Sequence, residues 1–395
     1  MSIQFSALAS HVQQIAQKSL QTNIADLDAG LFLSAGANQF KSFWTRDFCF
    51  ASRGLLAINR ADVVKSHLTY LINNRRADNL VPLYVDSMNP VNRVVQSSLF
   101  RAIRLQINSP VTNEIKPYYL VNGKYEAIDS NLMVLYASLL YLERTGDKAW
   151  FDSHKEDFRK IFDFYNSKIE RHMGLLWQNQ HADWQDSARR TGFTFFTNLL
   201  YYHMGVKYGF LSQLAADRLR NRIVTIFYDR KTGLFRSMGG RDQISLEGNL
   251  WAIEHNLIAN REILYSNLTK HELFRLNGGI PGFATFPSYT KDDTYIQVKV
   301  TGLQEYHGNI YWSWLLGYSA KIALMMNDSE RFLKIYTKLA QVINRDQTVY
   351  EIYSHNANLT PFKSYLYASE APFSWGSGFI LDLERDISIR RAAKN

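Results

Sequence analysis

The apolar residues of this chain recur at helical spacing almost from end to end, and this pattern limits the fold more than any other feature. Strand signals are few, and the best is the alternating segment Tyr-Ile-Gln-Val-Lys-Val at 295–300. The chain therefore predicts an all-α fold of about a dozen helices. The expected helices are 4–20, 46–58, 60–74, 92–106, 129–145, 148–171, 192–207, 209–227, 248–259, 261–272, 306–324, 328–346 and 372–386.

Two helical architectures fit this number of helices. A solenoid of helix hairpins requires repeats at a fixed period, and the chain shows none. The other is an (α/α)6 toroid, a closed double ring of six inner and six outer helices, whose inner helices are buried on all sides and therefore unusually apolar. Segments 130–142 and 310–323 are apolar in this way. The sequence favours the toroid.

The chain is expected to form a single domain over residues 1–395, with 1–40 as an N-terminal helix and lead-in. It contains only 8 prolines, and no Gly/Ser-rich or low-complexity stretch interrupts it. Residues 1–20 lack the features of a secretory signal, and no apolar run reaches the ~18 residues of a membrane span. A cytoplasmic location without membrane association is expected, and export without a cleaved signal stays open.

The formal charge of +9 comes from scattered lysines and arginines, which indicates a solvated basic surface and no nucleic-acid partner. The single cysteine, Cys49, excludes an intrachain disulfide. No His/Cys/Asp cluster has the spacing of metal ligands, so neither a metal nor a cofactor is expected. Aromatic residues make up 14% of the chain, which suits a protein that stacks flat rings such as sugar faces.

Two early loops concentrate aromatic and charged residues. In segment 41–48, Trp44 offers a ring for stacking, while Arg46 and Asp47 can bind adjacent hydroxyls. Alternatively, Asp47 caps the helix and pairs with Arg46.

Segment 177–187 holds Asp183, Trp184 and Asp186, and carboxyls three residues apart share a face if the segment is helical. A neighbouring tryptophan would raise the pKa of one carboxyl toward that of a general acid. A simple capping turn is the alternative.

Two later loops have the same character. In segment 306–317, the spacing of Trp312 and Trp314 puts the two rings on different sides of a helix, so one can pack in the core while the other lines a pocket. A purely structural role for either ring stays open, and His307 and Asn309 at the mouth favour ligand contact. The fourth loop begins at 349, where Glu351 lies between aromatic residues. It ends at 369–378, where Trp375 begins the last helix. Glu370 is equally well explained as a site residue or as an acid that complements the dipole of that helix.

Together these motifs resemble the (α/α)6-barrel glycosidases of the amylo-α-1,6-glucosidase, processing α-glucosidase and alkaline/neutral invertase group. The resemblance runs from about residue 40 to 385 in the expected order. It rests on Trp44-Thr-Arg-Asp47-Phe, Ala127-Ile-Asp129-Ser, Trp184-Gln-Asp186-Ser, Tyr306-His-Gly-Asn-Ile-Tyr-Trp-Ser-Trp314-Leu-Leu-Gly and Tyr350-Glu351-Ile-Tyr353 with Phe373-Ser-Trp375-Gly-Ser-Gly. The chain departs from the family pattern at Gly308-Asn309, Ser313 and Asn131. Only about 40 residues precede the Arg-Asp motif, so the β-sandwich domain usual ahead of the barrel is not expected in this chain.

The resemblance implies an inverting glycoside hydrolase that acts on a glucose-containing, α-linked substrate. Asp186 would be the general acid and Glu351 the general base, with the carboxyls ~6.5–9.5 Å apart. Trp184 would keep Asp186 protonated, and hydrogen bonds would keep Glu351 ionised. The expected sugar-binding residues are Trp44, Arg46, Asp47, Asp129, Asp183, Trp184, His307, Trp312 and Trp375.

Three other readings stay open. The changes at Gly308-Asn309 and Ser313 fit a carbohydrate-binding or regulatory relative that has lost catalysis. A sugar epimerase or lyase on the same toroid would use a histidine or tyrosine base, so His181 or His307 facing the sugar would be its sign. A helical interaction scaffold would have no deep aromatic pocket.

Overall fold

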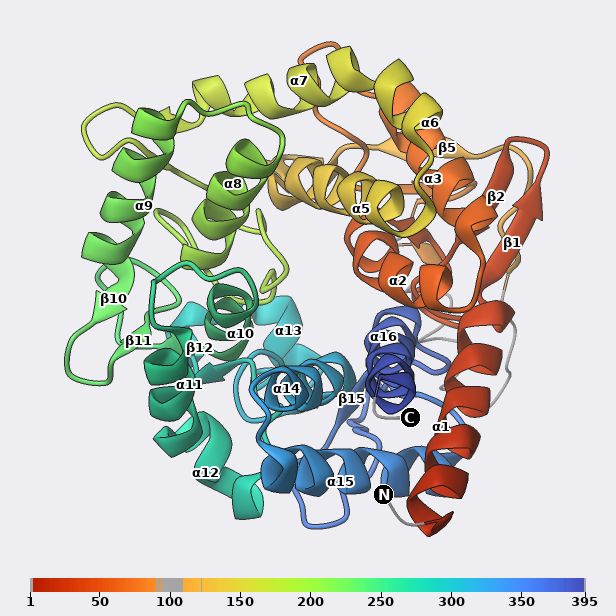
Figure 1. Ribbon diagram of the computed structural model, residues 1–395. Coiled ribbons are helices and arrows are strands. Elements are labelled where there is room, and N and C mark those ends of the chain that lie inside the picture. Colours follow the sequence, from red (N-terminus) through yellow and green to blue (C-terminus); the bar gives the residue numbers. More distant parts are fainter. Residues whose placement is uncertain (1–2, 90–91, 94–108, 122, 394–395) are drawn as a thin grey trace.

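The computed structural model describes residues 3–89, 92–93, 109–121 and 123–393. Within these residues, six helices form a closed inner ring in which each packs against the next, and the last packs against the first (Figure 1). The inner helices are α2 (Thr45–Ala57), α5 (Asp129–Thr145), α8 (Phe195–Lys207), α10 (Leu246–Glu254), α14 (Ser313–Met325) and α16 (Ser374–Ala392). Their residues are buried nearly all round, as expected for a layer enclosed by protein.

An outer layer of helices surrounds this ring, and all of them except α12, which packs against α11, contact an inner helix that is a neighbour in the chain or in space. The outer helices are amphipathic, because only one face meets the inner ring. They are α1 (Ile3–Thr22), α3 (Ala61–Asn73), α6 (Lys148–Ser153), α7 (Lys155–Asp163), α9 (Gln213–Phe227), α11 (Arg261–Lys270), α12 (Glu272–Gly279) and α15 (Ser329–Asp346). The double ring is the all-α toroid that the sequence predicts.

Short antiparallel strands connect the helices, mostly as hairpins. The strands are β1 (Ile24–Leu27), β2 (Gly30–Leu33), β3 (Phe43–Trp44), β4 (Tyr84–Asp86), β5 (Lys116–Tyr118), β6 (Leu120–Val121), β7 (Tyr125–Glu126), β8 (Ile169–Glu170), β9 (Leu175–Leu176), β10 (Tyr228–Asp229), β11 (Leu234–Phe235), β12 (Ile244–Ser245), β13 (Thr285–Phe286), β14 (Tyr311–Trp312) and β15 (Ile352–Tyr353). The 3₁₀ turns are Phe164–Ser167 and Lys291–Asp293.

One predicted strand is wrong. Segment 295–300 contains the short helix α13 (Ile296–Val300). Ile296 and Val300 are 62% and 65% exposed, so the apolar alternation does not correspond to a buried strand face. The two residues are four positions apart, a spacing that places them on one face of a helix and equally on one face of a strand. A short alternating run therefore fits either element. The expected helix 92–106 lies largely outside the described residues, and the expected helix 148–171 is divided into α6 and α7.

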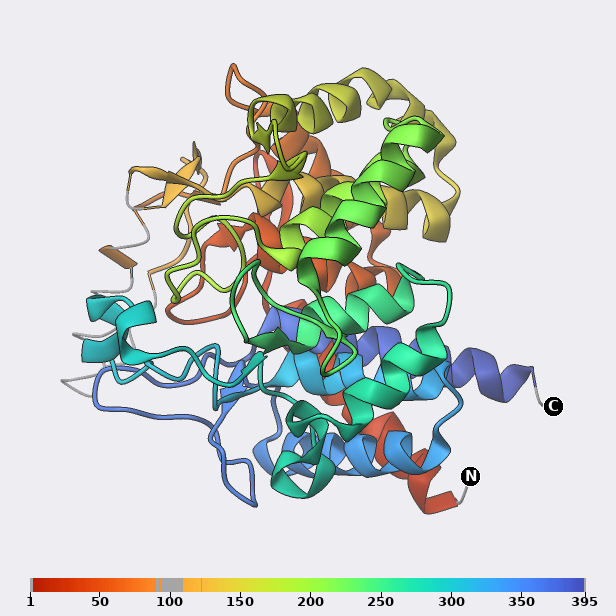
Figure 2. The same cartoon turned by 90° about the vertical axis from the view of Figure 1, so that its left-hand side faces the viewer.

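The two ends of the double ring differ. Figure 2 shows the long connections, most of the small strands and α13 gathered at one end, while both chain termini lie at the other. The inner helices begin at the loop end, so the positive ends of their dipoles point there and favour negatively charged groups. No helix among the described residues has the length and apolarity needed to cross a bilayer.

Candidate active site

A pocket of about 270 Å³ opens among the loops at the N-terminal ends of the inner helices. All four loops identified from the sequence contribute side chains to it. Its lining residues are Phe40, Trp44, Arg46, Asp47, His181, Trp184, Asp186, Ser187, Val298, Leu303, Tyr306, Trp312, Glu351, Tyr367, Phe373 and Trp375. The fold thus brings Asp186 and Glu351, which are far apart in the sequence, into one aromatic pocket.

Asp186 is positioned by an irregular turn that precedes α8. The main-chain oxygen of Asp186 accepts a hydrogen bond from His181 Nδ1 at 2.8 Å, which fixes the turn from within. Its Oδ2 is 3.2 Å from Arg46 Nη1, and 39% of its side-chain surface is open to the pocket. Burial by the pocket walls raises the pKa of Asp186, while the nearby Arg46 and His181 oppose this effect.

Glu351 is positioned by the pairing of β14 with β15. In this two-residue ladder, Trp312 lies opposite Ile352, so Trp312 and Glu351 are brought to the same wall. Two phenols, Tyr306 and Tyr367, donate hydrogen bonds to the two oxygens of the Glu351 carboxyl group. The side chain is almost fully buried, with the residue only 2% exposed.

The two hydrogen bonds favour ionised Glu351, as expected from the sequence, but they are not the largest influence on this group. Burial raises the pKa of Glu351 to about 8, and this effect exceeds the lowering by the Tyr306 and Tyr367 hydroxyls. At neutral pH the group therefore carries a proton. Burial raises the pKa of both carboxyls of the pocket, and Arg46 opposes this effect at Asp186.

Four tryptophans contribute to the apolar wall of the pocket. The indole of Trp184 stands nearly perpendicular to those of Trp312 and Trp375, with ring centroids 5.5 and 5.7 Å away. Trp44 packs against Tyr84 at 4.7 Å on another side. Trp314, by contrast, is fully buried beneath the pocket, so the Trp-x-Trp spacing separates a pocket ring from a core ring. Flat apolar rings of this kind suit the C–H faces of a sugar.

The first turn of α2 supplies Arg46 and Asp47. Asp129 makes a two-point ion pair with Arg46, at 2.7 Å from Oδ2 to Nε and 3.1 Å from Oδ1 to Nη2. Asp129 is fully buried behind the arginine and does not line the pocket. Asp47 does line the pocket, and burial raises its pKa to about 7 against the influence of Arg46. Arg46 and Asp47 are thus the polar groups of this loop available to hydroxyls, with Asp129 as a support.

Two further sequence candidates do not reach the pocket. Asp183 is 1% exposed and pairs with Arg190 at 3.2 Å, because segment 181–187 forms turns rather than a helix and the two carboxyls diverge. His307 is buried, stacks on Trp312 with centroids 5.6 Å apart, and contacts Ser187 Oγ through Nδ1 at 2.6 Å. Both side chains hold the loops that carry the pocket residues.

Two residues of this region were not among the expected sugar-binding residues. His181, which the sequence offered only as the sign of an epimerase or lyase, lines the pocket with a left-handed backbone, φ 58°, and its ring stacks on Tyr295 at 4.1 Å. Non-glycine residues in this conformation are strained and cluster at functional sites. Glu247, in the first turn of α10, is fully buried and accepts a hydrogen bond from Gln185 at 2.8 Å. An acid in the first turn of an apolar inner helix is the signal that Asp47, Asp129 and Glu247 share.

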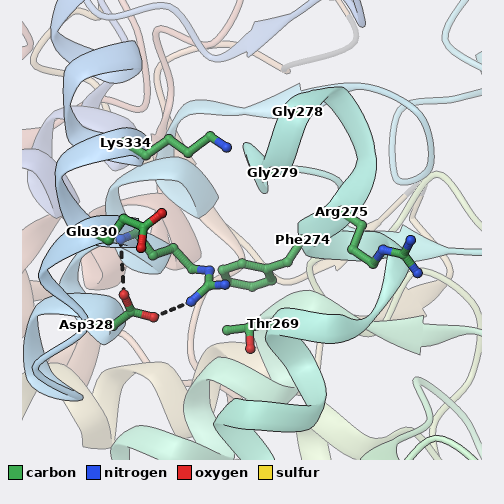
Figure 3. Close-up of a pocket in the computed structure, with 9 residues that line it drawn as sticks. Thr269, Phe274, Arg275, Gly278, Gly279, Asp328, Glu330 and Lys334 are labelled. Atoms are coloured by element: carbon green, nitrogen blue, oxygen red, sulfur yellow. Dashed lines mark hydrogen bonds and ion pairs between the residues drawn. The ribbon is translucent and has the colours of Figure 1, made fainter.

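A second depression, of about 290 Å³, lies on the outer layer between α12 and α15 (Figure 3). Its charged groups already stabilise the helices around it. Asp328 accepts from the backbone nitrogen of Arg331 at the start of α15 and pairs with the guanidinium of the same residue. Lys334 Nζ lies beside Gly279 at the end of α12, where a cation complements the helix dipole. Phe274 is the one aromatic ring among its lining residues, and the Asp328 carboxylate is already paired with Arg331, so the aromatic pocket is the candidate active site.

The fold is that of an (α/α)6 toroid with an aromatic, carboxyl-bearing pocket at the loop end. No protein-family model matches the sequence, and no curated protein matches it. Solved structures match the fold. A rhamnosidase from Klebsiella oxytoca with rhamnose bound has a TM-score of 0.64 at 12% identity, over 95% of this chain and 63% of that one. A glycosidase variant in complex with glucose has a TM-score of 0.58 at 13% identity, over 96% of this chain and 98% of that one.

A third structure, the GH78 family rhamnosidase of Bacillus sp. GL1, has a TM-score of 0.59 at 13% identity, over 95% of this chain and 34% of that one. At these identities the likeness establishes the toroid fold. The chain spans less than two thirds of either rhamnosidase but nearly the whole length of the glycosidase.

Proposed function

We propose that this protein is a glycoside hydrolase that removes a glucose-like sugar from an α-linked substrate with inversion of configuration. The observation that carries the proposal is the presence of Asp186 and Glu351 in one pocket walled by tryptophans. Hydrolysis of a glycoside requires two carboxyls on opposite sides of the bond, one to protonate the leaving oxygen and one to activate water. The toroids that match include structures with rhamnose or glucose bound, which supports a sugar as the ligand.

In this proposal Asp186 donates the proton and Glu351 accepts one from water. The resemblance of the loops to the debranching-type glucosidases supports this assignment. The environment of Glu351 opposes this assignment in one respect, since burial raises its pKa to about 8 and a general base must be ionised. The proposed cycle therefore requires that Glu351 be ionised and Asp186 protonated when the substrate is bound.

The pocket also indicates the size of the substrate. Sites for drug-sized ligands span roughly 300–1,000 Å³, and this pocket measures about 270 Å³. It suits one sugar ring rather than a long chain, so we propose that the enzyme acts on a terminal residue. Trp44, Trp312 and Trp375 would stack on the ring, and Arg46 and Asp47 would bind its hydroxyls.

The substrate is tested first with a panel of α- and β-glucosides, sucrose, trehalose, mannosides and rhamnosides, by following the release of free sugar. The two roles are then tested with substrates that differ in the leaving group. Asp186→Asn should lose about 10²–10⁴-fold in turnover of an ordinary glycoside. It should keep most of its activity on a glycosyl fluoride, because fluoride leaves without a proton. Glu351→Gln should fail on both substrates.

Asp242→Asn, an exposed position, is the matched control and should behave as wild type. The reverse pattern of losses would exchange the two roles, and normal activity in both variants would remove the proposal. In the same assay, proton NMR of the first product should show the anomer opposite to that of the substrate. A retained configuration would exclude the inverting scheme.

A sugar epimerase is the second candidate, and the position of His181 in the pocket favours it. Since the Nδ1 atom faces the main-chain oxygen of Asp186, the Nε2 atom is left to contact a ligand. An epimerase breaks a carbon–hydrogen bond, whereas a glycosidase does not. Incorporation of solvent deuterium at a sugar carbon would therefore identify an epimerase. A bound sugar with neither hydrolysis nor exchange would identify a binding relative.

A further inference from the structure

A third hollow, separate from the aromatic pocket and from the depression between α12 and α15, lies at the other end of the inner ring. It measures about 210 Å³ and is lined by side chains of α5, α8, α14 and α16, together with the end of α10. These side chains come from the C-terminal parts of α5, α8, α10 and α14, whereas the catalytic pocket lies at the N-terminal ends. Both chain termini are at this end of the molecule (Figure 2).

The carboxylates on the floor of this cavity are already paired. Asp382, which is 1% exposed, accepts hydrogen bonds from Lys321 Nζ at 2.5 Å and Arg144 Nη2 at 3.0 Å. Glu254 accepts a hydrogen bond from the Tyr318 hydroxyl at 2.5 Å and lies 3.2 Å from Lys321 Nζ. The floor therefore has little capacity left for a cationic ligand.

Several nitrogens around the cavity make no hydrogen bond in the described part of the chain. Arg144 Nη1 and His255 Nε2 are buried in this way, and His255 Nε2 lies 3.9 Å from Glu254 Oε2. His203 is only 8% exposed, and its ring lies against that of His255 with centroids 3.9 Å apart and the planes tilted by 34°. Lys207 follows one helical turn later and is exposed at the mouth. A buried polar group without a partner costs about 1–3 kcal/mol.

From this arrangement we propose that the cavity binds a small phosphate-type oxyanion. Such a ligand has oxygens that accept from Arg144 and Lys207. Burial lowers the pKa of His203 to about 2 and that of His255 to about 4, so both rings are neutral and each has one donor and one acceptor nitrogen. At neutral pH, phosphate keeps an O–H group that can donate to such a nitrogen, while sulfate has none. Glu143 at the mouth carries the opposite charge and limits the affinity.

Inorganic phosphate is the probe that tests this site. Sodium phosphate at about ten times its dissociation constant should raise the midpoint of thermal unfolding by about 1–3 °C, and above the dissociation constant the rise should grow with the logarithm of phosphate concentration. Sodium chloride and sodium sulfate at equal ionic strength should give a smaller change that is linear in concentration. A phosphate monoester such as glycerol phosphate distinguishes a ligand that carries the group from free phosphate, according to which of the two raises the midpoint at lower concentration.

Variants connect the effect to this cavity. Lys207→Met removes an exposed charge and leaves the fold intact, and His203→Phe keeps a flat ring against His255. Each should weaken phosphate binding about tenfold. Arg171→Met, at an exposed position outside the cavity lining, is the charge-matched control and should leave binding unchanged. An unchanged response in both variants, or a crystal structure grown in phosphate with only water in the cavity, would overturn the proposal.

Discussion

Glu351 shows how two opposing influences act on one carboxyl group. The hydroxyls of Tyr306 and Tyr367 stabilise the ionised form, yet burial dominates and raises the pKa to about 8. In the unfolded chain the pKa returns near 4.5, the ordinary value. The folded state therefore holds more protons than the unfolded state between these two values. The consequence is that stability falls as the pH rises from about 4.5 to about 8.

Replacing this group by a neutral amide should remove that dependence. Glu351→Gln is expected to be more stable than wild type by about 2–5 kcal/mol at pH 9, with little difference at pH 5. Urea unfolding of both proteins at the two pH values measures the effect. Glu114→Gln, which changes an exposed carboxylate, should show no such gain. An equal difference at both pH values would mean that the carboxyl is ionised throughout.

Single residues also show where sequence reasoning stops. The sequence pattern identifies Asp186, Glu351 and the pocket tryptophans as candidate site residues, because a connecting loop rarely contains so many acids and indoles. It cannot separate Asp186 from Asp183, since the choice depends on turns that direct one carboxyl to Arg190 and the other to the pocket. Nor could it find Tyr367, whose role arises only from its contact with Glu351.

At the scale of elements, helices were predictable and contacts between them were not. Long periodic segments give nearly the observed bounds of α2, α5 and α15, because burial on one or all faces imposes a 3.6-residue period. The helix expected at 306–324 begins only at Ser313, because turns and β14 occupy the residues before it. The five residues of α13 are too few for a period to decide between helix and strand. Which helices touch most closely is set by small residues, as the contact between α2 and α16 shows.

Gly54 of α2 and Gly378 of α16 allow these two inner helices to touch at the backbone. A Cβ atom on Gly378 would lie 2.6 Å from Ala51 Cα, and one on Gly54 would lie 2.5 Å from Gly378 Cα. Gly378→Ala should therefore push the helices apart and destabilise the fold by about 1–3 kcal/mol or more. Denaturant unfolding monitored by circular dichroism provides the measurement.

The matched control for this prediction is Gly317→Ala in α14, where the added Cβ would meet Phe379 Cβ at 3.4 Å. Alanine has the higher helix propensity, by about 1 kcal/mol, so this variant should be close to neutral. If both variants behaved alike, the close crossing of α2 and α16 would not be the cause.

For the whole molecule, the important feature is that the ring closes on itself. The last helix, α16, packs between α14 and α2 and also contacts α1, so the two ends of the chain complete the same core (Figure 1). No consecutive subset of helices can bury its apolar faces without the others. This differs from a solenoid, in which each repeat contacts only its neighbours and stability is nearly additive. The toroid is therefore expected to unfold as one unit.

This expectation tests the proposal that the chain is a single domain. Far-ultraviolet circular dichroism reports on all helices, whereas tryptophan fluorescence is weighted toward the pocket end, where Trp44, Trp184, Trp312 and Trp375 lie. Equilibrium urea unfolding followed by both signals should give coincident transitions with one midpoint and one slope. Two separate midpoints would show that part of the ring stays folded alone. In that case the closure of α16 on α2 would not be what makes the core cooperative.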